Sequence, residues 1–431
     1  MGVTDAVLLG LLGCGTVGGA VLRLLEEHAE EIAGRAGWRP SVFRVGVQDP
    51  ARERDVPADP DVFTTDLGSI VADPQVEIVV ELMGGVEPAR ALLHEALRNG
   101  KHVVTANKEL LATHGAELFE HAAEAGVQIA FEAAVGGGIP LVRPIRESLA
   151  GEQVSRVMGI VNGTTNFILT RMTEDAMTFA DALSEAQALG YAERDPTDDV
   201  EGHDAAAKCA ILATIAFDSN VTAADVFREG ITGVTKEDIA FADRLGHVVK
   251  LLAVAELEDG QVAARVHPTM IPRAHPLAAV REAFNAVFVE GDHVGELMFY
   301  GRGAGGDPTA TAVVGDIVHV ARELGATHVP LPPAVERRRG IRAMDRMEGQ
   351  YYLCLHVADR PGVLAQVAGV FGDNLVSIKS VWQEGTGREA LLVLITHRAN
   401  EGAMQATVAG LRGLDAVTEV RSMMRVEGEG E

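Results

Sequence analysis

The stretch from Glu193 to Lys208, ERDPTDDVEGHDAAAK, holds six carboxylates and ends in a lysine that opens an apolar run. Asp204 and Lys208 are four residues apart, so on a helix they share one face. Because almost every residue from Ala205 to Phe217 other than Lys208 is apolar, we expect this helix to be buried and the pair to face a polar cleft. Carboxylates beside a lysine suit a substrate that carries a cationic amine and an oxygen needing a proton. A surface ion pair is the alternative interpretation.

A glycine motif near the start of the chain is typical of dinucleotide binding. Gly13, Gly15 and Gly18, with Thr16 and Val17 between the last two, follow an apolar strand and open an amphipathic helix. Glycine lets the backbone turn tightly and approach a pyrophosphate, whose charge lies at the helix N-terminus. A plain tight turn is the alternative.

The end of the next strand normally selects the cofactor, because an acidic residue there accepts the ribose hydroxyls of NAD and an arginine accommodates the 2′-phosphate of NADP. Here Asp49 competes with Arg52 and Arg54. This part of the sequence leaves NADP and NAD both open.

Strands and helices then alternate as far as about residue 145, which predicts a doubly wound parallel sheet with ligands at the carboxyl ends of its strands. Lys108 and Glu132 lie at two such ends, although Lys108 could also be a surface residue at a helix start. The loop from Asn162 to Asn166 follows a further strand and has the small polar side chains that either bind a ligand or cap a helix.

Composition excludes several classes of function. The chain has 431 residues, enough for two to four domains, and a net charge of −25, which opposes binding to nucleic acid or to an anionic membrane. Three cysteines far apart fit neither a disulfide framework nor a zinc motif. With no targeting segment evident, we expect a cytoplasmic protein.

From Tyr351 the pattern changes to strand, helix, two strands, helix and strand, the order of a ferredoxin-like domain. The basic, unpatterned residues 336–349 before it are the best candidate for a linker.

Four motifs in order resemble those of the homoserine dehydrogenases. The longest runs from Ala186 through GYAERDPTDDVEGHD to Lys208, and the others are TANK, EAAVGGGIP and GIVNGTTNFIL. The C-terminal segment ADRPGVLAQVAGVF resembles the start of an ACT domain, a module that binds amino acids. The resemblance implies reversible NAD(P)H-dependent reduction of L-aspartate 4-semialdehyde to L-homoserine, on the path to threonine and methionine.

The resemblance also implies roles for individual residues. Lys108, Lys208 and Asp204 resemble the catalytic residues, and Glu193 resembles the carboxylate that holds the substrate amine. The remaining expected substrate contacts are Asp199, Asn162, Gly163, Thr164 and Thr165. The expected cofactor contacts are Gly13, Gly15, Thr16, Val17, Gly18, Arg52, Thr105, Lys108 and Gly306. Glu132 and the carbonyls near Val135, Gly137 and Ile139 would hold Na⁺ or K⁺, and Asp359, Gly362 and Asn374 would contact L-threonine as an inhibitor.

By the same resemblance, residues 1–134 form a Rossmann-type nucleotide-binding domain completed by about 305–335. Residues 135–304 then form an α+β catalytic and dimerisation domain, and 350–431 the ACT domain. The resemblance favours NADP, but Gln48 stands where many members carry arginine, so NAD remains open. We expect a homodimer or homotetramer. An amino-acid sensor without turnover is the alternative function, and a dimerisation module without ligand is the alternative for the ACT-like domain.

Overall fold

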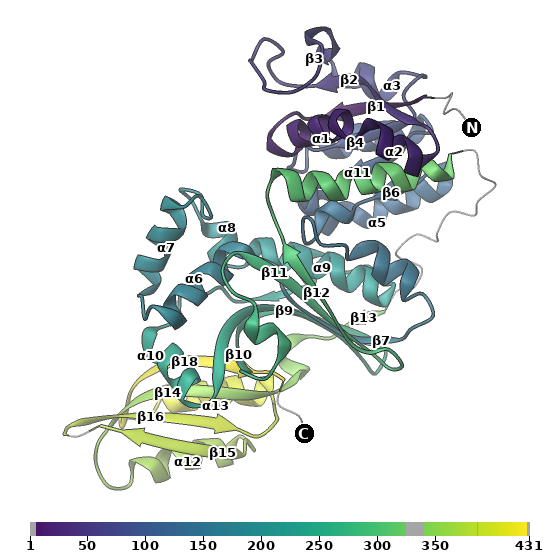
Figure 1. Cartoon of the computed structure of the whole chain (residues 1–431). Coiled ribbons are helices and arrows are strands. Elements are labelled where there is room, and N and C mark those ends of the chain that lie inside the picture. Colours follow the sequence, from purple (N-terminus) through teal and green to yellow (C-terminus); the bar gives the residue numbers. More distant parts are fainter. Residues whose placement is uncertain (1–5, 325–338, 386, 429–431) are drawn as a thin grey trace. The chain divides into compact units, whose positions relative to one another are not determined.

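The computed structural model describes residues 6–324, 339–385 and 387–428 (Figure 1). It divides into two compact units. The first comprises residues 1–157, 207–225 and 285–339, and the second comprises 158–206, 226–284 and 340–431. Strand β7 (Val154–Ile160) and helix α9 (His203–Phe217) each begin in one unit and end in the other.

A six-stranded sheet forms the centre of the first unit. Its order is β3-β2-β1-β4-β5-β6, and every neighbouring pair is parallel. The strands are β1 (Ala6–Leu12), β2 (Arg39–Gly46), β3 (Phe63–Thr64), β4 (Ile78–Glu81), β5 (His102–Thr105) and β6 (Ile129–Ala130). The order reverses between β1 and β4, the point at which open parallel sheets bind ligands.

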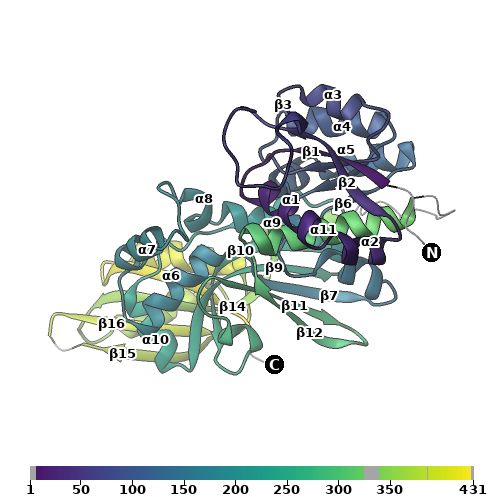
Figure 2. The same ribbon diagram turned by 45° about the horizontal axis from the view of Figure 1, so that its top comes forward.

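Helices cover both faces of this sheet (Figure 2). One face carries α1 (Thr16–Glu27), α2 (Ala29–Ala36) and α11 (Gly306–Glu323), and the other carries α3 (Leu67–Ala72), α4 (Ala89–Arg98) and α5 (Lys108–Ala125). Although α11 comes late in the chain, it packs against α1, and its Ala321 carbonyl accepts a 2.9 Å hydrogen bond from Trp38 Nε1. Their apolar faces and the buried strands make one core, which excludes water from the sheet.

The first unit also contains β12 (Gly295–Arg302) and all but the first residue of β11 (Phe284–Gly291), and these strands follow β7 in sheet order. Two short helical turns, Glu132–Ala134 and Pro144–Ser148, lie between β6 and β7.

The second unit contains a long antiparallel pair, β9 (His247–Glu258) and β10 (Gln261–Pro272). Its helices are α6 (Gly163–Glu174), α7 (Phe179–Ala188), α8 (Thr197–Val200) and α10 (Lys236–Arg244), and the short strand β8 (Phe227–Arg228) pairs with β10.

The C-terminal part of the second unit has the element order βαββαβ, formed by β14 (Glu348–Ala358), α12 (Val363–Asp373), β15 (Ile378–Glu384), β16 (Glu389–Thr396), α13 (Glu401–Arg412) and β18 (Val417–Val426). Two further strands of two residues each, β13 (Gly340–Ile341) and β17 (Ala399–Asn400), precede β14 and α13. The sheet order β18-β14-β16-β15 and the antiparallel pairs are those of a ferredoxin-like fold. Strand β18 also pairs with β10, so this sheet continues into the rest of the unit.

The predicted fold class is confirmed: a doubly wound parallel sheet, a mixed-sheet region and a C-terminal ferredoxin-like arrangement. Within the predicted linker, residues 336–338 lie outside the described residues, and 340–349 contain β13 and a short helical turn. Residues 325–335 of the segment predicted to complete the first domain also lie outside the described residues. In the part of the chain that the structure describes, no helix is long and apolar enough to cross a membrane.

Candidate active site

The glycine motif lies where β1 ends and α1 begins. Gly13 has φ +106°, and a Cβ there would lie 2.8 Å from the carbonyl oxygen of Leu82. A Cβ on Gly18 would collide with the carbonyl of Gly13, whereas Gly15, the N-cap of α1, faces open space. No side chain caps this helix, so its first N–H groups are available to a phosphate. Gly306 closes the motif from α11, since a Cβ there would lie 3.1 Å from Thr16 Cγ2.

The loops after β4 and β5 are held by a buried glutamate. Glu81 Oε1 accepts hydrogen bonds from the N–H groups of Met83 (2.8 Å) and Gly84 (3.2 Å), and its Oε2 accepts one from Thr105 Oγ1 (2.7 Å). Thr105 Oγ1 in turn accepts from the N–H of Asn107, whose own side chain caps α5 at Leu110. This network places Lys108, the first residue of α5, at the carboxyl edge of the sheet.

Lys108 and Lys208 line the same cavity, of about 360 Å³, within the first unit. The lining also includes Val17, the loop after β4, Asn107, Gly136, Gly137 and the turn Gly303–Gly305. The cavity therefore opens beside the glycine motif, at the sheet edge where the sequence predicts a ligand. Lys208 is 9% exposed, so its amine is largely removed from solvent. An ammonium in such a place can stabilise negative charge that develops on a substrate oxygen.

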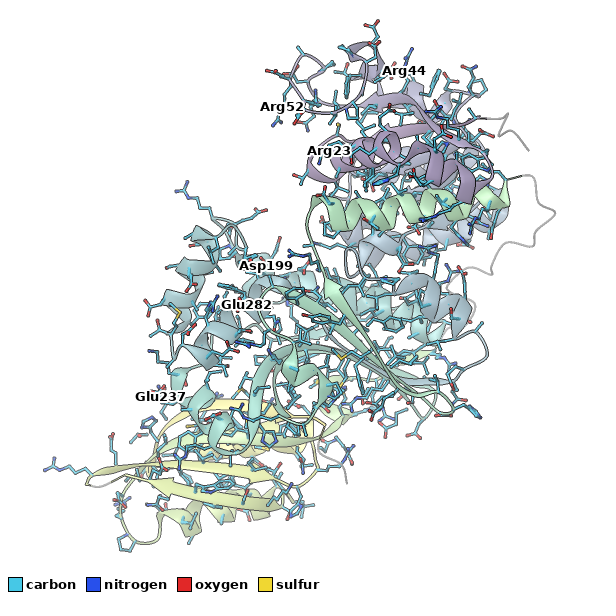
Figure 3. The ribbon with its side chains drawn as sticks, viewed as in Figure 1. Arg23, Arg44, Arg52, Asp199, Glu237 and Glu282 are labelled. Carbon is cyan, nitrogen blue, oxygen red and sulfur yellow. The ribbon has the colours of Figure 1, made fainter. Side chains whose placement is uncertain are left out.

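Arginines gather beside the glycine motif. Burial raises the pKa of the Cys14 thiol, and the charges of Arg54 and Arg23 oppose that rise, which places both guanidiniums near the motif. Arg54 donates to the carbonyl oxygens of Asp49 (2.9 Å) and Arg52 (2.8 Å), while Arg52 is exposed in the loop between β2 and β3 (Figure 3). The sequence analysis named Arg52 as a cofactor contact but not Arg23. Arg23 lies on α1, outside the segment that normally determines the preference for NAD or NADP.

In the second unit, one amide holds two carboxylates. Asn162 Nδ2 donates to Asp199 Oδ1 at 2.6 Å and to Asp204 Oδ2 at 2.9 Å. Its Oδ1 accepts from the N–H of Thr165, so the same side chain caps α6. Asp204 is 8% exposed, and two carboxylates so close together favour a cationic partner. Both interpretations of the Asn162 loop, helix cap and ligand-binding group, remain compatible with this geometry.

The other predicted substrate residues have different environments. Thr164 Oγ1 donates to the carbonyl of Tyr191, and Thr165 Oγ1 donates back to Asn162. Gly163 packs against the carbonyl of Ala283, which a Cβ would approach to 2.8 Å. Glu193 is exposed, and only its backbone carbonyl accepts a described hydrogen bond, from Gln187. Hydrogen bonds therefore connect Asn162, Asp199 and Asp204 but do not include the Glu193 carboxylate.

Glu132 is 1% exposed and accepts four hydrogen bonds. They come from the backbone N–H groups of Leu141, Val142 (2.7 Å) and Arg143 (3.0 Å) and from Arg143 Nε (3.1 Å). The N–H of Glu132 donates to Asp316 (2.8 Å), and burial together with the Glu132 charge raises the pKa of Asp316 to about 8. Among the described residues, no cluster of three or more His, Cys, Asp or Glu is arranged to hold a metal ion. The carbonyls of Val135, Gly137 and Ile139 accept no hydrogen bond from any described residue.

The three predicted effector residues lie around α12. Gly362 (φ +90°) is its N-cap, with Asp359 just before it, and Asn374 is its C-cap, where its side chain donates to the carbonyl of Val370 at 2.8 Å. A helix of 11 residues is about 16 Å long at 1.5 Å per residue. One small ligand cannot touch both ends in a single chain.

Comparison with known proteins identifies the family. The model for homoserine dehydrogenase matches residues 140–318, and that for the homoserine dehydrogenase NAD binding domain matches 13–132. The homoserine dehydrogenase of Mycobacterium tuberculosis (strain ATCC 25618 / H37Rv) is 49% identical over 98% of each chain. The chain belongs to the homoserine dehydrogenases. The Bacillus subtilis (strain 168) homoserine dehydrogenase is 42% identical over 99% of each chain.

Solved homoserine dehydrogenases share the fold. That of Thiobacillus denitrificans superposes with a TM-score of 0.93 at 43% identity and covers 98% of each chain. A hyperthermophilic archaeal homoserine dehydrogenase in complex with NADPH covers 73% of this chain and 98% of its own, with a TM-score of 0.61 and 29% identity. The chain is therefore an NAD(P)-dependent oxidoreductase, and the comparisons give no support to an inactive sensor.

Sequence reasoning missed several polar residues in and around the candidate site. Glu81, Arg143 and Asp316 were not selected, although a glutamate that ends an apolar strand is a signal that could have identified Glu81. Lys250 was also missed. It is 5% exposed and donates to Asn166 Oδ1 at 2.9 Å and to the carbonyl of Val280 at 2.5 Å. Nothing in the local sequence around Lys250 indicates these partners, which lie 84 and 30 residues away in the chain.

Proposed function

We propose that the chain reduces L-aspartate 4-semialdehyde reversibly to L-homoserine, with NADPH preferred over NADH, under inhibition by L-threonine. The observation that supports the proposed reaction is the cavity lined by both Lys108 and Lys208, at the carboxyl edge of a dinucleotide-binding sheet. Asp204 precedes Lys208 by one turn of α9, so one helix presents a carboxylate for the amine and an ammonium for the oxygen.

The cofactor, the two lysines and the carboxylates have separate roles in the reaction. The nicotinamide cofactor, when bound, supplies the hydride to the aldehyde carbon. Lys108 and Lys208 stabilise the developing alkoxide, and one of them delivers its proton. Asp199 and Asp204, held by Asn162, bind the substrate ammonium. By its place in the signature, which resembles that of the family throughout its length, Glu193 is a further ligand of the amine.

The test is homoserine-dependent reduction of NADP and of NAD, followed by nicotinamide absorbance. Turnover should fall by about 10²–10⁴-fold in Lys208→Met or Lys108→Met, the range of general acid–base catalysis. Lys236→Met, an exposed lysine at the start of α10, is the control and should retain activity. Folded protein without turnover with either cofactor would refute the proposal.

The preference for NADP is supported by Arg23 and Arg54 near the glycine motif, because guanidiniums suit a 2′-phosphate. Arg52 lies in the same loop as Arg54, which donates to its carbonyl oxygen. The ratio of kcat/KM with NADPH to that with NADH should fall in Arg52→Gln. An unchanged ratio would remove Arg52 from the cofactor site.

A monovalent cation is also proposed near Glu132. The carbonyls of Val135, Gly137 and Ile139 would be its ligands, and they suit Na⁺ or K⁺ because they are uncharged oxygens without described hydrogen bonds. The Glu132 carboxylate, already saturated by N–H donors, would supply negative charge nearby. Turnover in NaCl or KCl should exceed turnover in choline chloride at equal ionic strength.

Inhibition by threonine is proposed at the ends of α12. Because one ligand cannot reach Asp359 and Asn374 in the same chain, the proposal requires two chains, each contributing one end of the helix. The exposed edge strand β15, with Val381 and Trp382 at its surface, suits such pairing. A homodimer or homotetramer follows from this arrangement. Asp359→Ala or Asn374→Ala should relieve inhibition and leave basal turnover intact, and unchanged inhibition would refute the effector site.

We expect the protein to act in the cytoplasm. Cys14, Cys209 and Cys354 form no disulfide in the described part of the chain, as in a reducing compartment, and the net charge of −25 disfavours nucleic acid or an anionic membrane as a partner.

A further inference from the structure

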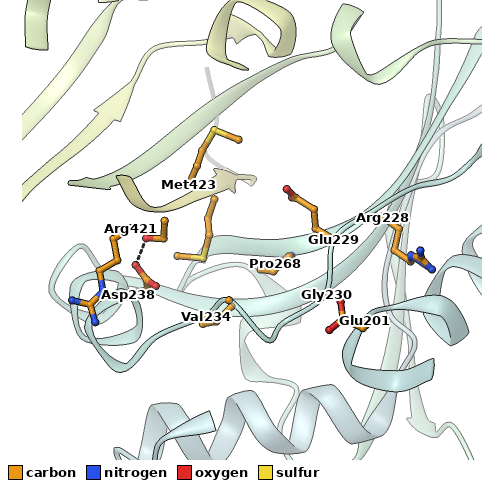
Figure 4. A pocket seen from close by; sticks show the side chains of 12 residues that line it. Glu201, Arg228, Glu229, Gly230, Val234, Asp238, Pro268, Arg421 and Met423 are labelled. Atoms are coloured by element: carbon orange, nitrogen blue, oxygen red, sulfur yellow. Dashed lines mark hydrogen bonds between the residues drawn. The ribbon is translucent and has the colours of Figure 1, made fainter. Parts of the chain in front are cut away.

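A second cavity, of about 430 Å³, lies entirely within the second unit, apart from the lysine-lined cavity (Figure 4). One wall is the segment Arg421–Met424 of β18, in the C-terminal ferredoxin-like part. The opposite wall is the loop Glu229–Val234, together with Glu201 at the end of α8 and Pro268 of β10. Its size falls in the range of about 300–1,000 Å³ typical of small-molecule sites.

Two of the polar groups in the lining are already satisfied. Asp238 accepts four hydrogen bonds, from the N–H and Oγ1 of Thr235, from Tyr352 Oη and from Ser422 Oγ, the last drawn in Figure 4. Arg421 pairs with Glu237 at 2.9 Å and with His356 at 3.0 Å. The hydrogen bonds of Asp238 and Arg421 join β18 to α10 and β14. Both side chains therefore have few positions left at which a ligand could form a hydrogen bond.

Other groups keep hydrogen-bonding capacity. Glu201 Oε1 accepts from Thr232 at 3.1 Å and Glu229 Oε2 pairs with Arg425, but the second oxygen of each carboxylate accepts no hydrogen bond from a described residue. The N–H groups of Gly230 and Gly233 likewise donate none to the described residues. The cavity thus offers two negatively charged acceptors and two backbone donors. The guanidinium of Arg228 also lies in the lining, with its Nη1 in contact with His203 Nδ1.

The rest of the lining is apolar: Val234, Pro268, Met423 and Met424. In Figure 4 the side chains of Glu229 and Met423 come from opposite walls of the cavity. Carboxylates complement an ammonium, N–H groups and an arginine complement a carboxylate, and this surface complements a hydrocarbon or thioether side chain. We propose that the cavity binds a free α-amino acid with an apolar side chain, at a site distinct from the ends of α12.

Such a ligand would affect the substrate-binding carboxylates. The N–H of Ile231 donates to the carbonyl of Val200 at 2.8 Å, and Gly230 packs so closely on that carbonyl that a Cβ would collide with it. Val200 ends α8, in which the preceding residue, Asp199, is held by Asn162. A ligand that moves the loop Glu229–Val234 therefore changes the position of Asp199 and the affinity for the amino-acid substrate. This consequence rests on the proposed function, whereas binding itself does not.

The test uses the full-length protein, calorimetric titration and a panel of L-valine, L-isoleucine and L-methionine. N-Acetyl-L-valine and isobutylamine, which lack the ammonium and the carboxylate respectively, are matched negative probes. Gly233→Leu is the blocking variant, because Gly233 lines the cavity and a Cβ there meets nothing within 4 Å. Gly151→Leu, at a glycine in the first unit that also has open space around it, is the control.

We expect at least one panel amino acid to bind and both negative probes to fail. Gly233→Leu should abolish binding and Gly151→Leu should retain it. Glu201→Gln should raise the Kd by about tenfold, the loss expected for one charge-assisted hydrogen bond. Absence of binding by every panel member, or equal binding by Gly233→Leu and Gly151→Leu, would overturn the inference. Binding that survives Gly233→Leu but is lost in Asn374→Ala would assign the amino acid to α12 instead and would also overturn it.

Turnover is measured on the same samples. Turnover without panel binding refutes this site and leaves the proposed function standing. Binding without turnover refutes the proposed function and leaves the site standing.

Discussion

At the scale of the residue, Asn162 lets two carboxylates approach within hydrogen-bond distance of one amide. Each of its two Nδ2 hydrogens goes to a different acid, so the amide brings two negative charges close together. Under the proposed function, this pair of carboxylates binds the substrate ammonium.

Asp204→Asn tests this explanation. The substitution keeps the shape of the side chain and removes one charge, so we expect kcat/KM for homoserine to fall by about 10²-fold or more while the urea midpoint changes little. The control is Asp198→Asn, an exposed acid in the same stretch. A parallel loss of folding stability in Asp204→Asn would show that the cluster is structural.

Lys250 supports the neighbouring residue Asn166 from β9. Burial lowers the pKa of Lys250 to about 8. Between pH 8 and about 10.5, the usual pKa of an exposed lysine, the unfolded chain binds more protons at this residue than the folded chain, so the Lys250 contribution to folding free energy becomes more favourable as pH rises.

Lys250→Met removes this contribution and leaves Asn166 Oδ1 and the Val280 carbonyl without their lysine donor. The variant should be less stable by about 1–3 kcal/mol, the cost of buried unsatisfied acceptors. Urea unfolding at pH 7.5, 9 and 10 should show the gap to the parent protein widening with pH. A gap that is constant or narrows would contradict the lowered pKa.

At the scale of the element, the turn between β1 and α1 depends on close backbone contact. Gly18 lies against the carbonyl of Gly13, and Gly13 lies against that of Leu82, so α1 starts directly beside the strand ends. This position brings the helix N-terminus to the sheet edge where the lysine-lined cavity opens.

Gly18→Ala should displace α1 and raise the KM for NADPH by about tenfold or more, since small misplacements near a reacting group are costly. Gly34→Ala is the matched control on α2, where a Cβ meets nothing within 4 Å. It should leave the KM unchanged and raise stability slightly, because alanine favours a helix over glycine by about 1 kcal/mol. Equal KM values for both variants would show that the contact at Gly18 does not position the cofactor.

At the scale of the whole molecule, the C-terminal ferredoxin-like part is built into the second unit. Strand β18 pairs with β10, buried Arg265 bonds Glu427 at 2.7 Å, and buried Asp238 accepts from Tyr352 and Ser422. The region that would sense an amino acid therefore shares hydrogen bonds with the region that carries Asp199 and Asp204.

Truncation after Arg339 should consequently destabilise the rest of the second unit instead of producing a desensitised enzyme. Arg265 would keep Glu256 but lose Glu427, and the edge of β10 would be exposed. Soluble yield and the urea midpoint of residues 1–339 measure the effect. A folded, fully active truncated chain would show that these contacts are dispensable.

The sequence by itself determined the fold class, the glycine motif and the family. Strand–helix alternation, glycine spacing and a long contiguous signature are local patterns, and local patterns set elements and their order. Tertiary structure decided which side chains meet. Lys108 and Lys208 share a cavity, Asn162 joins two acids about 40 residues away in the chain, and Asp359 and Asn374 are separated by α12. These outcomes depend on sheet order, helix length and packing between distant segments, and spacing along the chain does not encode them.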